Sequence, residues 1–384
     1  MSERTRREFL RQLGLGAVGF LGIRIMSGCE FVSVEQKGGL TGTEPFLTPA
    51  DDGIWYWQSG QGLSKEASPR LTPESWRLRI TQGNDTLGEF DHAALKALES
   101  EGKAVSYWKT MRCVFSLNVG PPLLTLVANG IFKGIPLADL FEGLDLPADG
   151  VKIRTFGADG FTSNLALSRV LEPAAEALPA IIAYELNGEP MTRLRGGPAR
   201  LIIPEMWGYK NVKWIDRLDL TRDGAAFGQY ETVLFPGNAL IDNPGTVALG
   251  STITSPRTAR AEVAGPDVTI SGIAVVGDDR IDRVEVSLDD GDFVAAELIG
   301  DEPGAVRVDL SPALQTAMND TLQANQSWPL PNVWVTWAIV FEGLAAGSHS
   351  VTIRASDSQG RKQSSQSSNI LLVGNEVRME FVVT

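Results

Sequence analysis

The sequence predicts two structured parts, an α+β domain followed by an all-β sandwich. Up to about residue 220, segments that alternate like strands are mixed with short amphipathic helices. From about residue 252 onward the pattern contains strands and turns only, at the spacing typical of a sandwich. Glycine and proline number 40 and 21 of 384 residues, more than average, which favours a turn-rich, β-rich chain.

The first part contains short strands and two short helices. Asp91 is expected to cap a helix that carries Leu95 and Leu98 on one face. Residues 135–141 predict a second helix with Pro136 in its first turn, where the missing N–H costs nothing. Strands are expected at residues 76–81, 105–111, 151–156 and 180–186.

The second part contains β-prone runs separated by turn signals. The D-D-G sequence at residues 289–291 predicts a turn between two strands. A long polar connection that contains prolines occupies residues 319–331. We expect Trp328, Trp334 and Trp337 in the core of the sandwich. Strands are expected at residues 268–276, 281–288, 333–341, 348–355 and 377–383.

The composition excludes several classes of protein. The formal net charge of −13 argues against nucleic-acid binding, which needs a basic face, and leaves a cationic partner possible. The chain has only two cysteines and two histidines, without the spacing of a structural zinc site, an H-E-x-x-H site or a C-x-x-C-H haem site. Any demanding chemistry therefore depends on a bound cofactor, on carboxylates or on a single thiolate.

The N-terminus has the pattern of a targeting segment. Residues 5–11, T-R-R-E-F-L-R, form a twin-arginine motif, and a weakly apolar stretch follows at residues 13–25. We expect residues 1–28 to be an export signal that directs the chain to the periplasm or another extracytoplasmic location; the alternative is an amphipathic N-terminal helix. Residues 26–29, M-S-G-C, resemble a lipoprotein cleavage box, which makes Cys29 a lipidation candidate that would anchor the chain at a membrane; otherwise Cys29 is lost or idle. Residues 29–70 are expected to form a tether and lead-in.

Cys113 follows an apolar, β-prone run, and by itself it can be read as a small buried hydrophobe. Three blocks downstream favour a functional role. N-G-I-F-K-G-I-P-L-A-D-L at residues 129–140, A-D-G-F-T-S at residues 158–163 and the set between residues 187 and 214 are similar to signatures of the sulfite-oxidase family of molybdopterin enzymes. The spacing from Arg200 to Lys213 is the spacing of that family.

The resemblance continues into the second part of the chain. Residues 270–291, 333–337 and 353–360 look like the C-terminal immunoglobulin-like domain of the family, so the likeness covers about residues 76–360. It implies a molybdopterin-binding domain at residues 71–245 and an immunoglobulin-like sandwich at residues 246–384. In relatives the second domain pairs two subunits, and a homodimer is therefore expected.

The resemblance implies a molybdenum–molybdopterin cofactor with Cys113 as the protein ligand of the metal, and thiolate is a soft ligand suited to such a site. The expected cationic anchors of the cofactor are Arg200, Lys213 and Arg195, which stands where many relatives have histidine; the alternative is a solvated basic patch. Asp159 and Gly160 match a loop that lines the cofactor.

The surroundings of the cysteine depart from the pattern of sulfite-oxidising members. Such members have anion-binding arginines just after the cysteine, whereas here Arg112 is the only nearby cation in sequence. Their upstream Arg-Asn-His cluster is replaced by the segment that contains Tyr56 and Gln58, residues that we expect at the cofactor. The candidate catalytic set is Cys113, Arg112 and Asp159. We expect a more aromatic, less cationic pocket, unless arginines from later segments restore the charge.

The function implied is an exported, divergent molybdopterin-dependent oxidoreductase that transfers an oxygen atom in a two-electron step. Because the chain has no haem motif, electrons would pass singly to or from a separate partner such as a cytochrome. One alternative is a reductase of S-oxides, for example methionine sulfoxide. A non-enzymatic alternative is a scaffold lipoprotein that has lost the cofactor.

Overall fold

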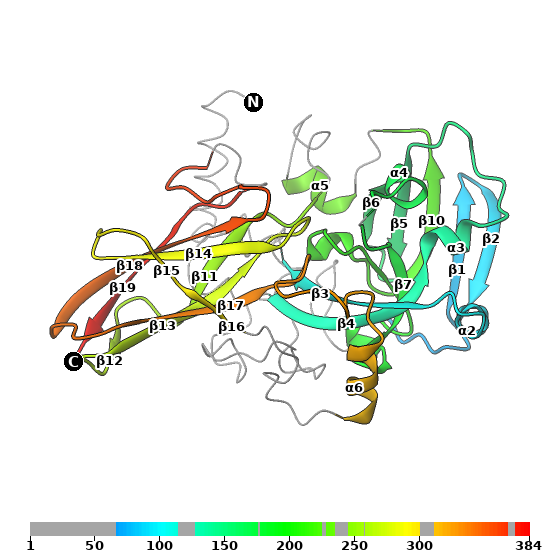
Figure 1. The fold of residues 1–384 in the computed structure, drawn as a ribbon. Helices are drawn as coiled ribbons and strands as arrows, with labels where there is room; N and C mark the ends of the chain where they lie inside the picture. The colour runs from blue at the N-terminus through cyan, green and yellow to red at the C-terminus, as the bar shows by residue number, and fades with distance from the viewer. Residues whose placement is uncertain are drawn as a thin grey trace.

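The computed structural model describes residues 67–113, 127–175, 177–224, 228–234, 245–256, 258–299, 311–367 and 373–384. The predicted signal, most of the tether, and the candidate residues Cys29, Tyr56 and Gln58 lie outside these ranges. Figure 1 shows two lobes, with strands β1–β10 in one and β11–β19 in the other. No helix in the described ranges is long and apolar enough to cross a membrane. The domain limits given above stay a prediction.

The first sheet of the first lobe has the strand order β2-β1-β10-β5-β6. The pair β1–β10 is parallel and the other neighbours are antiparallel. The predicted strands at residues 76–81 and 151–156 are confirmed within one residue at each end. The strands are β1 (Arg77–Gln82), β2 (Asp85–Asp91), β5 (Lys152–Gly157), β6 (Thr162–Ala166) and β10 (Ile215–Thr221).

The second sheet carries the strand that directly precedes Cys113. Its order is β3-β4-β7-β8, and a further strand, β9, pairs with β7. The strand β3 is an edge strand that pairs with β4 on one side, with Arg112 opposite Val127. The strands are β3 (Val105–Arg112), β4 (Val127–Pro136), β7 (Ile181–Leu186), β8 (Glu189–Pro190) and β9 (Arg200–Ile202).

The predicted cap of the first helix is confirmed, because the side chain of Asp91 accepts a hydrogen bond of 2.8 Å from the N–H of Ala94. The predicted position of Pro136, inside the first turn of the second helix, is wrong by one residue. Pro136 still pairs with Ile181 at the end of β4, and the helix begins at the next residue. The helices are α2 (His92–Ser100), α3 (Leu137–Phe141), α4 (Ser168–Leu171), α5 (Gln229–Leu234) and the 3₁₀ turns η4 (Arg193–Arg195) and η5 (Gly208–Lys210).

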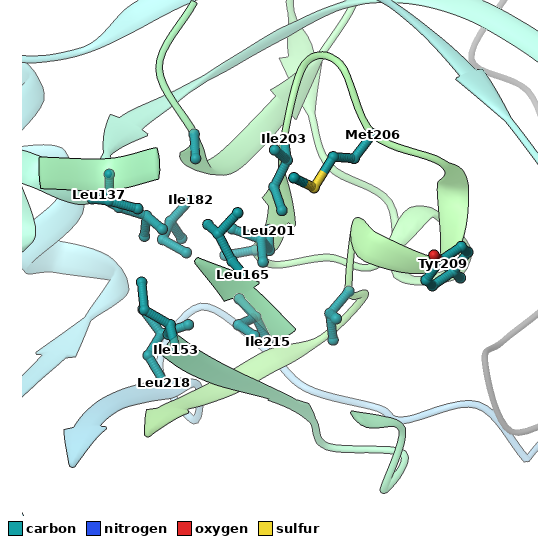
Figure 2. Close-up of a cluster of buried hydrophobic side chains, with 14 of the residues drawn as sticks. Leu137, Ile153, Leu165, Ile182, Leu201, Ile203, Met206, Tyr209, Ile215 and Leu218 are labelled. Carbon is teal, nitrogen blue, oxygen red and sulfur yellow. The ribbon is translucent and has the colours of Figure 1, made fainter. Parts of the chain in front are cut away.

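The two sheets of the first lobe share one apolar core. Figure 2 shows side chains from both sheets pointing toward one another: Ile153, Leu165, Ile215 and Leu218 from the first sheet, and Ile182 and Leu201 from the second. Burial of these side chains removes apolar surface from water and fixes the two sheets against each other. The segments between the strands, including the cofactor-site candidates, are held by this core.

The second lobe is a β-sandwich. One sheet has the order β11-β13-β17-β16 and the other β12-β19-β18-β14-β15, and buried apolar side chains from both sheets form one cluster. All five predicted strands are confirmed within two residues at each end. A specific likeness to immunoglobulin-like domains stays a prediction. The strands are β11 (Gly250–Ser255), β12 (Ala261–Val263), β13 (Val268–Val275), β14 (Ile281–Leu288), β15 (Val294–Ala295), β16 (Glu297–Ile299), β17 (Val335–Phe341), β18 (Gly347–Asp357) and β19 (Val377–Val383).

Two expectations about the second part are wrong. The region contains a helix, α6 (Pro312–Asn319), capped by Ser311, although only strands and turns were expected. The Ser-Pro pair at its start is a helix signal, since serine caps and proline fits the first turn. Of the three tryptophans, Trp337 lies in the sandwich core, whereas Trp334 lies in the core of the first lobe. Trp334 precedes β17, and its backbone is bonded to β3 instead of to the sandwich.

Candidate functional site

Cys113 lies directly after β3, at the point where the chain leaves the sheet. The strand residues before it, from Ser106 to Arg112, are buried, while Cys113 itself is partly exposed and is not in a disulfide. Its neighbour Arg112 belongs to the last pair of the β3–β4 ladder. The ordered strand therefore presents the thiol at a defined place that a ligand can reach.

Arg112 is buried and its guanidinium faces the second lobe. It lies over the ring of Trp207 at 5.3 Å, and its Nη1 donates to the carbonyl of Ala248 over 3.4 Å. A Cβ atom at Gly250 would lie 2.9 Å from the same nitrogen, so glycine gives the guanidinium room at this point. Burial lowers the pKa of Arg112 to about 10, which leaves it charged at neutral pH. Its role in catalysis stays a prediction.

Three predicted anchors come together beside β9, in what we call the cradle: Arg195, Arg200 and Lys213. Arg195 and Arg200 are only 1% and 4% exposed. Arg200 donates to the carbonyl of Arg195 over 2.8 Å and to that of Asn211 over 2.7 Å, and Lys213 donates to the carbonyl of Leu194 over 2.7 Å. These bonds join η4, β9 and the segment before β10 into one cationic unit, and buried cations need a compensating anion or strong dipoles.

Close backbone approach holds the cradle together. Gly196 ends η4 with a φ of 103°, and a Cβ atom there would lie 2.9 Å from the Cβ of Lys213. The indole N–H of Trp214 donates to the carbonyl of Arg193 over 2.8 Å, and the backbone N–H of Trp214 donates to the carbonyl of Gly196 over 3.1 Å. Only glycine combines this conformation with this packing.

The loop with Asp159 and Gly160 joins the same unit. A Cβ atom at Gly157 would lie 2.7 Å from a carboxylate oxygen of Asp159 and 2.7 Å from the carbonyl of Lys213. Asp159 accepts a hydrogen bond of 3.0 Å from the N–H of Phe161 and so shapes the turn. Gly160, with a φ of 83°, is exposed at its tip. The loop is thus placed beside Lys213, while a catalytic role for Asp159 stays a prediction.

The cradle and Cys113 belong to one sheet. Arg200 begins β9, which pairs with β7; β7 pairs with β4, and β4 pairs with β3, which Cys113 directly follows. In the register of this sheet, Arg200 lies opposite Ala183, Ala183 opposite Gly134 and Gly134 opposite Val105, whereas Arg112 lies opposite Val127. The donor set has the chemistry of a thiophilic metal site and of an anion site, because it contains a thiol and a group of cations.

A buried ion pair, which the sequence interpretation missed, supports the cradle. Lys210 of η5 and Glu231 of α5 are both buried and in contact, and Lys210 also donates to the carbonyl of Asn164 over 3.0 Å. Glu231 in addition accepts from the N–H of Gly228 over 2.6 Å. Since Lys210 precedes Asn211, whose carbonyl binds Arg200, the pair fastens α5 to the cradle.

Lys109 of β3 is a second buried cation that the sequence interpretation missed. It is 0% exposed, and its Nζ donates to the carbonyls of Pro204 and Met206 over 2.6 and 3.0 Å. Burial lowers its pKa to about 7, with Glu205 opposing this shift and Arg200 adding to it. The only signal in the sequence was a lysine within an apolar β-prone run.

Lys109 should make stability depend on pH. Its folded-state pKa of about 7 lies below the unfolded value of 10.5, so between these pH values only the unfolded chain holds the proton. Stability should therefore rise with pH in this window, by up to about 1.4 kcal/mol per pH unit from this group. Lys109→Met should remove this slope in urea unfolding at pH 7.5, 8.5 and 9.5, whereas Lys103→Met, at the surface, should keep it. An unchanged slope in Lys109→Met would contradict the assignment.

The fold and the cradle define a cofactor-binding oxidoreductase module: residues 65–226 match the model of the oxidoreductase molybdopterin binding domain. The chain is 35% identical to human mitochondrial sulfite oxidase over 177 residues, covering 42% of this chain and 30% of that protein. It is 31% identical to sulfite oxidase of Gallus gallus over 276 residues, covering 61% and 56% of the two chains. Residues 65–226 are therefore a molybdopterin-binding domain similar to that of sulfite oxidases, and the chain spans less than two thirds of the length of these relatives.

A solved structure supports the fold over most of the chain. The crystal structure of the sulfane dehydrogenase SoxCD from Paracoccus pantotrophus matches with a TM-score of 0.62, covering 87% of this chain and 80% of that one. At 19% identity, this likeness concerns the fold. The similarity of the two-lobed architecture therefore extends beyond the segment that the family model covers.

The matched domain implies a molybdenum–molybdopterin cofactor, and the residues present fit it. Cys113 offers a partly exposed thiol, not in a disulfide, for the metal. Arg195, Arg200 and Lys213 provide charge for an anionic end. The close approach at Gly157 and Gly196 packs the surrounding backbone tightly. Arg195 and Arg200 are buried and Lys213 is partly exposed, whereas their role as anchors of the cofactor stays a prediction.

Proposed function

We propose that this chain is an exported molybdenum oxidoreductase that transfers an oxygen atom in a two-electron step and exchanges electrons with a separate partner. The observation that carries the proposal is the thiol of Cys113, which is not in a disulfide and directly follows β3 of the sheet that also holds Arg200, within a matched molybdopterin-binding domain. Two-electron oxo transfer is the chemistry that the cofactor supplies when bound. The protein supplies the ligand, the anchors and the substrate pocket.

Each of these groups has a role under the proposal. Cys113 binds the metal as the thiolate, because coordination removes the thiol proton. Arg200 and Arg195 hold the anionic end, and their burial strengthens this attraction relative to water. Arg195 takes the place of the family histidine, and its position inside η4, next to Arg200, supports that substitution.

The substrate that we propose is a small sulfur compound. The relatives bear the name sulfite oxidase, and the solved structure is a sulfane dehydrogenase. Sulfite itself is not assumed, because Arg112, the cation beside Cys113 in sequence, faces Trp207 and Ala248. A neutral or weakly charged sulfur substrate fits this arrangement better than a doubly charged anion.

The remaining parts of the proposal rest on the sequence. The twin-arginine motif supports export to the periplasm, and Cys29 would carry a lipid anchor. The net charge of −13 favours a cationic, cytochrome-like electron partner, because opposite charges speed encounter. The sandwich is proposed to be immunoglobulin-like and to pair two copies of the chain. Sedimentation of the mature form tests this, and a monomer at micromolar concentration would contradict the dimer.

Metal analysis tests the proposal most directly. Protein expressed with intact cofactor synthesis should contain about one molybdenum atom per chain. Arg200→Met should lower this content by about tenfold or more, the scale expected when a charge-assisted anchor is lost. The matched control is Arg217→Met, at an arginine that stacks on Phe156 of the first sheet, and it should retain the metal. Absence of molybdenum from the wild-type protein would overturn the proposal.

A substrate screen separates the enzymatic alternatives. With an artificial electron acceptor, the loaded enzyme should oxidise a small sulfur substrate. With an artificial donor, the same preparation should be assayed for reduction of methionine sulfoxide. Oxidation alone supports the proposal, while reduction alone would assign the chain to the S-oxide reductase alternative.

A further inference from the structure

We propose that residues 321–334 of the second lobe, which we call the strap, position the thiol of Cys113, and that Gln323 is the residue through which the strap acts. This positioning role rests on the proposed function, in which Cys113 binds the metal. It concerns the part of the chain that lies between α6 and β17. In Figure 1 this region lies next to β3 and β4, far along the sequence from them.

The strap completes the open edge of β3. An edge strand leaves a row of backbone N–H and C=O groups without partners. Here Leu322 donates to the carbonyl of Ser106 over 2.8 Å, and Asn332 accepts from the N–H of Thr110 over 2.9 Å. Between these two bonds, the N–H of Trp108 donates to the side-chain oxygen of Gln323 over 2.7 Å. Three alternate residues of β3 are therefore held on the side that β4 does not cover.

Gln323 makes this contact with its side chain. It is 2% exposed, its oxygen accepts from β3, and its Nε2 donates to the carbonyl of Pro331 over 3.1 Å. It thus links the two ends of the strap to the middle of the cysteine-bearing strand. Because a side chain carries the bond, one substitution can remove it while the backbone of the strap stays unchanged.

The strap is itself held in place by buried apolar contacts. Leu314 and Met318 of α6, with Leu330 and Val333 of the strap, pack against Trp108 of β3 and Ile131 of β4. Trp334 joins the core of the first lobe, and its N–H donates to the hydroxyl of Thr110 over 2.8 Å. Release of the strap would expose these side chains to water, which is unfavourable.

The second lobe also holds the other end of the strand. Arg112, the residue before Cys113, donates to Ala248 and approaches Gly250. The C-terminal part of β3 is thus fixed by β4 on one side, by the strap on the other and by residues 248–250 at its end. Since metal sites are tuned by the groups that orient their ligands, these contacts are placed to set the position of the thiol.

Gln323→Met is the decisive variant, because it removes the acceptor and keeps a similar volume. In the full-length chain without cofactor, the amide of Trp108 should exchange with solvent at least about tenfold faster, and mass spectrometry should find faster alkylation of Cys113. In the loaded enzyme, kcat should fall by about tenfold, with KM and molybdenum content unchanged and the Mo(V) electron paramagnetic resonance spectrum altered.

Gln363→Met is the matched control. Gln363 is also a buried glutamine, and its oxygen accepts from the N–H of Ala355 over 2.9 Å, but it lies inside the sandwich. It should lower stability without changing alkylation of Cys113 or the spectrum. Equal effects of the two variants on the thiol would overturn the inference. If the wild-type chain binds no molybdenum, the proposed function fails, whereas the exchange and alkylation results still decide whether the strap positions Cys113.

Discussion

Replacing Cys113 with serine should lower the turnover of the loaded enzyme by at least about 100-fold, since loss of a ligand should cost no less than the loss of a group that orients one. A serine hydroxyl is nearly isosteric, but it does not supply the soft thiolate that the metal requires. Cys113 is partly exposed and follows the strand, so the substitution should leave the fold intact. Turnover per chain, molybdenum content and circular dichroism measure these effects together.

The matched control is the other cysteine of the chain. Cys29→Ser should leave turnover unchanged and abolish association with membranes, because Cys29 is the lipidation candidate in the lead-in. A Cys113→Ser enzyme with turnover within about twofold of the wild type would contradict the ligand assignment, because loss of a first ligand must cost more than that.

Glu231→Gln should destabilise the protein by about 3–5 kcal/mol, the usual effect of breaking a buried ion pair. The substitution leaves the charge of Lys210 buried without its carboxylate partner. Burial already lowers the pKa of Lys210, and Glu231 is the group that opposes this shift. The free energy of unfolding in urea measures the effect. Molybdenum content should fall as well, because Lys210 adjoins the segment that holds Arg200.

Two further variants make this test specific. Lys210→Met combined with Glu231→Gln should recover part of the lost stability, since no uncompensated charge remains. Asp149→Asn breaks the exposed pair with Arg222 and should cost less than about 1 kcal/mol. If Glu231→Gln were as mild as Asp149→Asn, the pair would not support the cradle.

The strands and the first cap could be predicted because their signals are local. Strand alternation in residues 76–81 follows from one buried face, and Asp91 caps its helix through a bond to a residue three positions away. The family blocks likewise point to Cys113 and to the cationic anchors, whose roles stay a prediction. The prediction failed where local signals were weak or misleading, as at α6, whose eight residues lie in a region of strands.

The position of Trp334 shows why some contacts could not be predicted. Its sequence neighbours, Val333 and Val335, belong to different apolar clusters, one at the outer face of β3 and one inside the sandwich. Trp334 itself lies in a third, the core of the first lobe. An alternating pattern shows that a side chain is buried, but it does not show against which layer it packs.

From the sequence alone came the strand periodicity, the export motif, the family and the identity of the thiol that would bind the metal. The tertiary structure decided how these parts meet: that the buried Arg195 and Arg200 form one cradle with the partly exposed Lys213, that Lys109 donates to two carbonyls, and that the strap covers β3. The reason is physical. Periodicity and capping depend on neighbours in the chain. The burial of a charge or the pairing of an edge strand depends on segments far away in the sequence, as for Gln323 and Trp108, which are 215 residues apart.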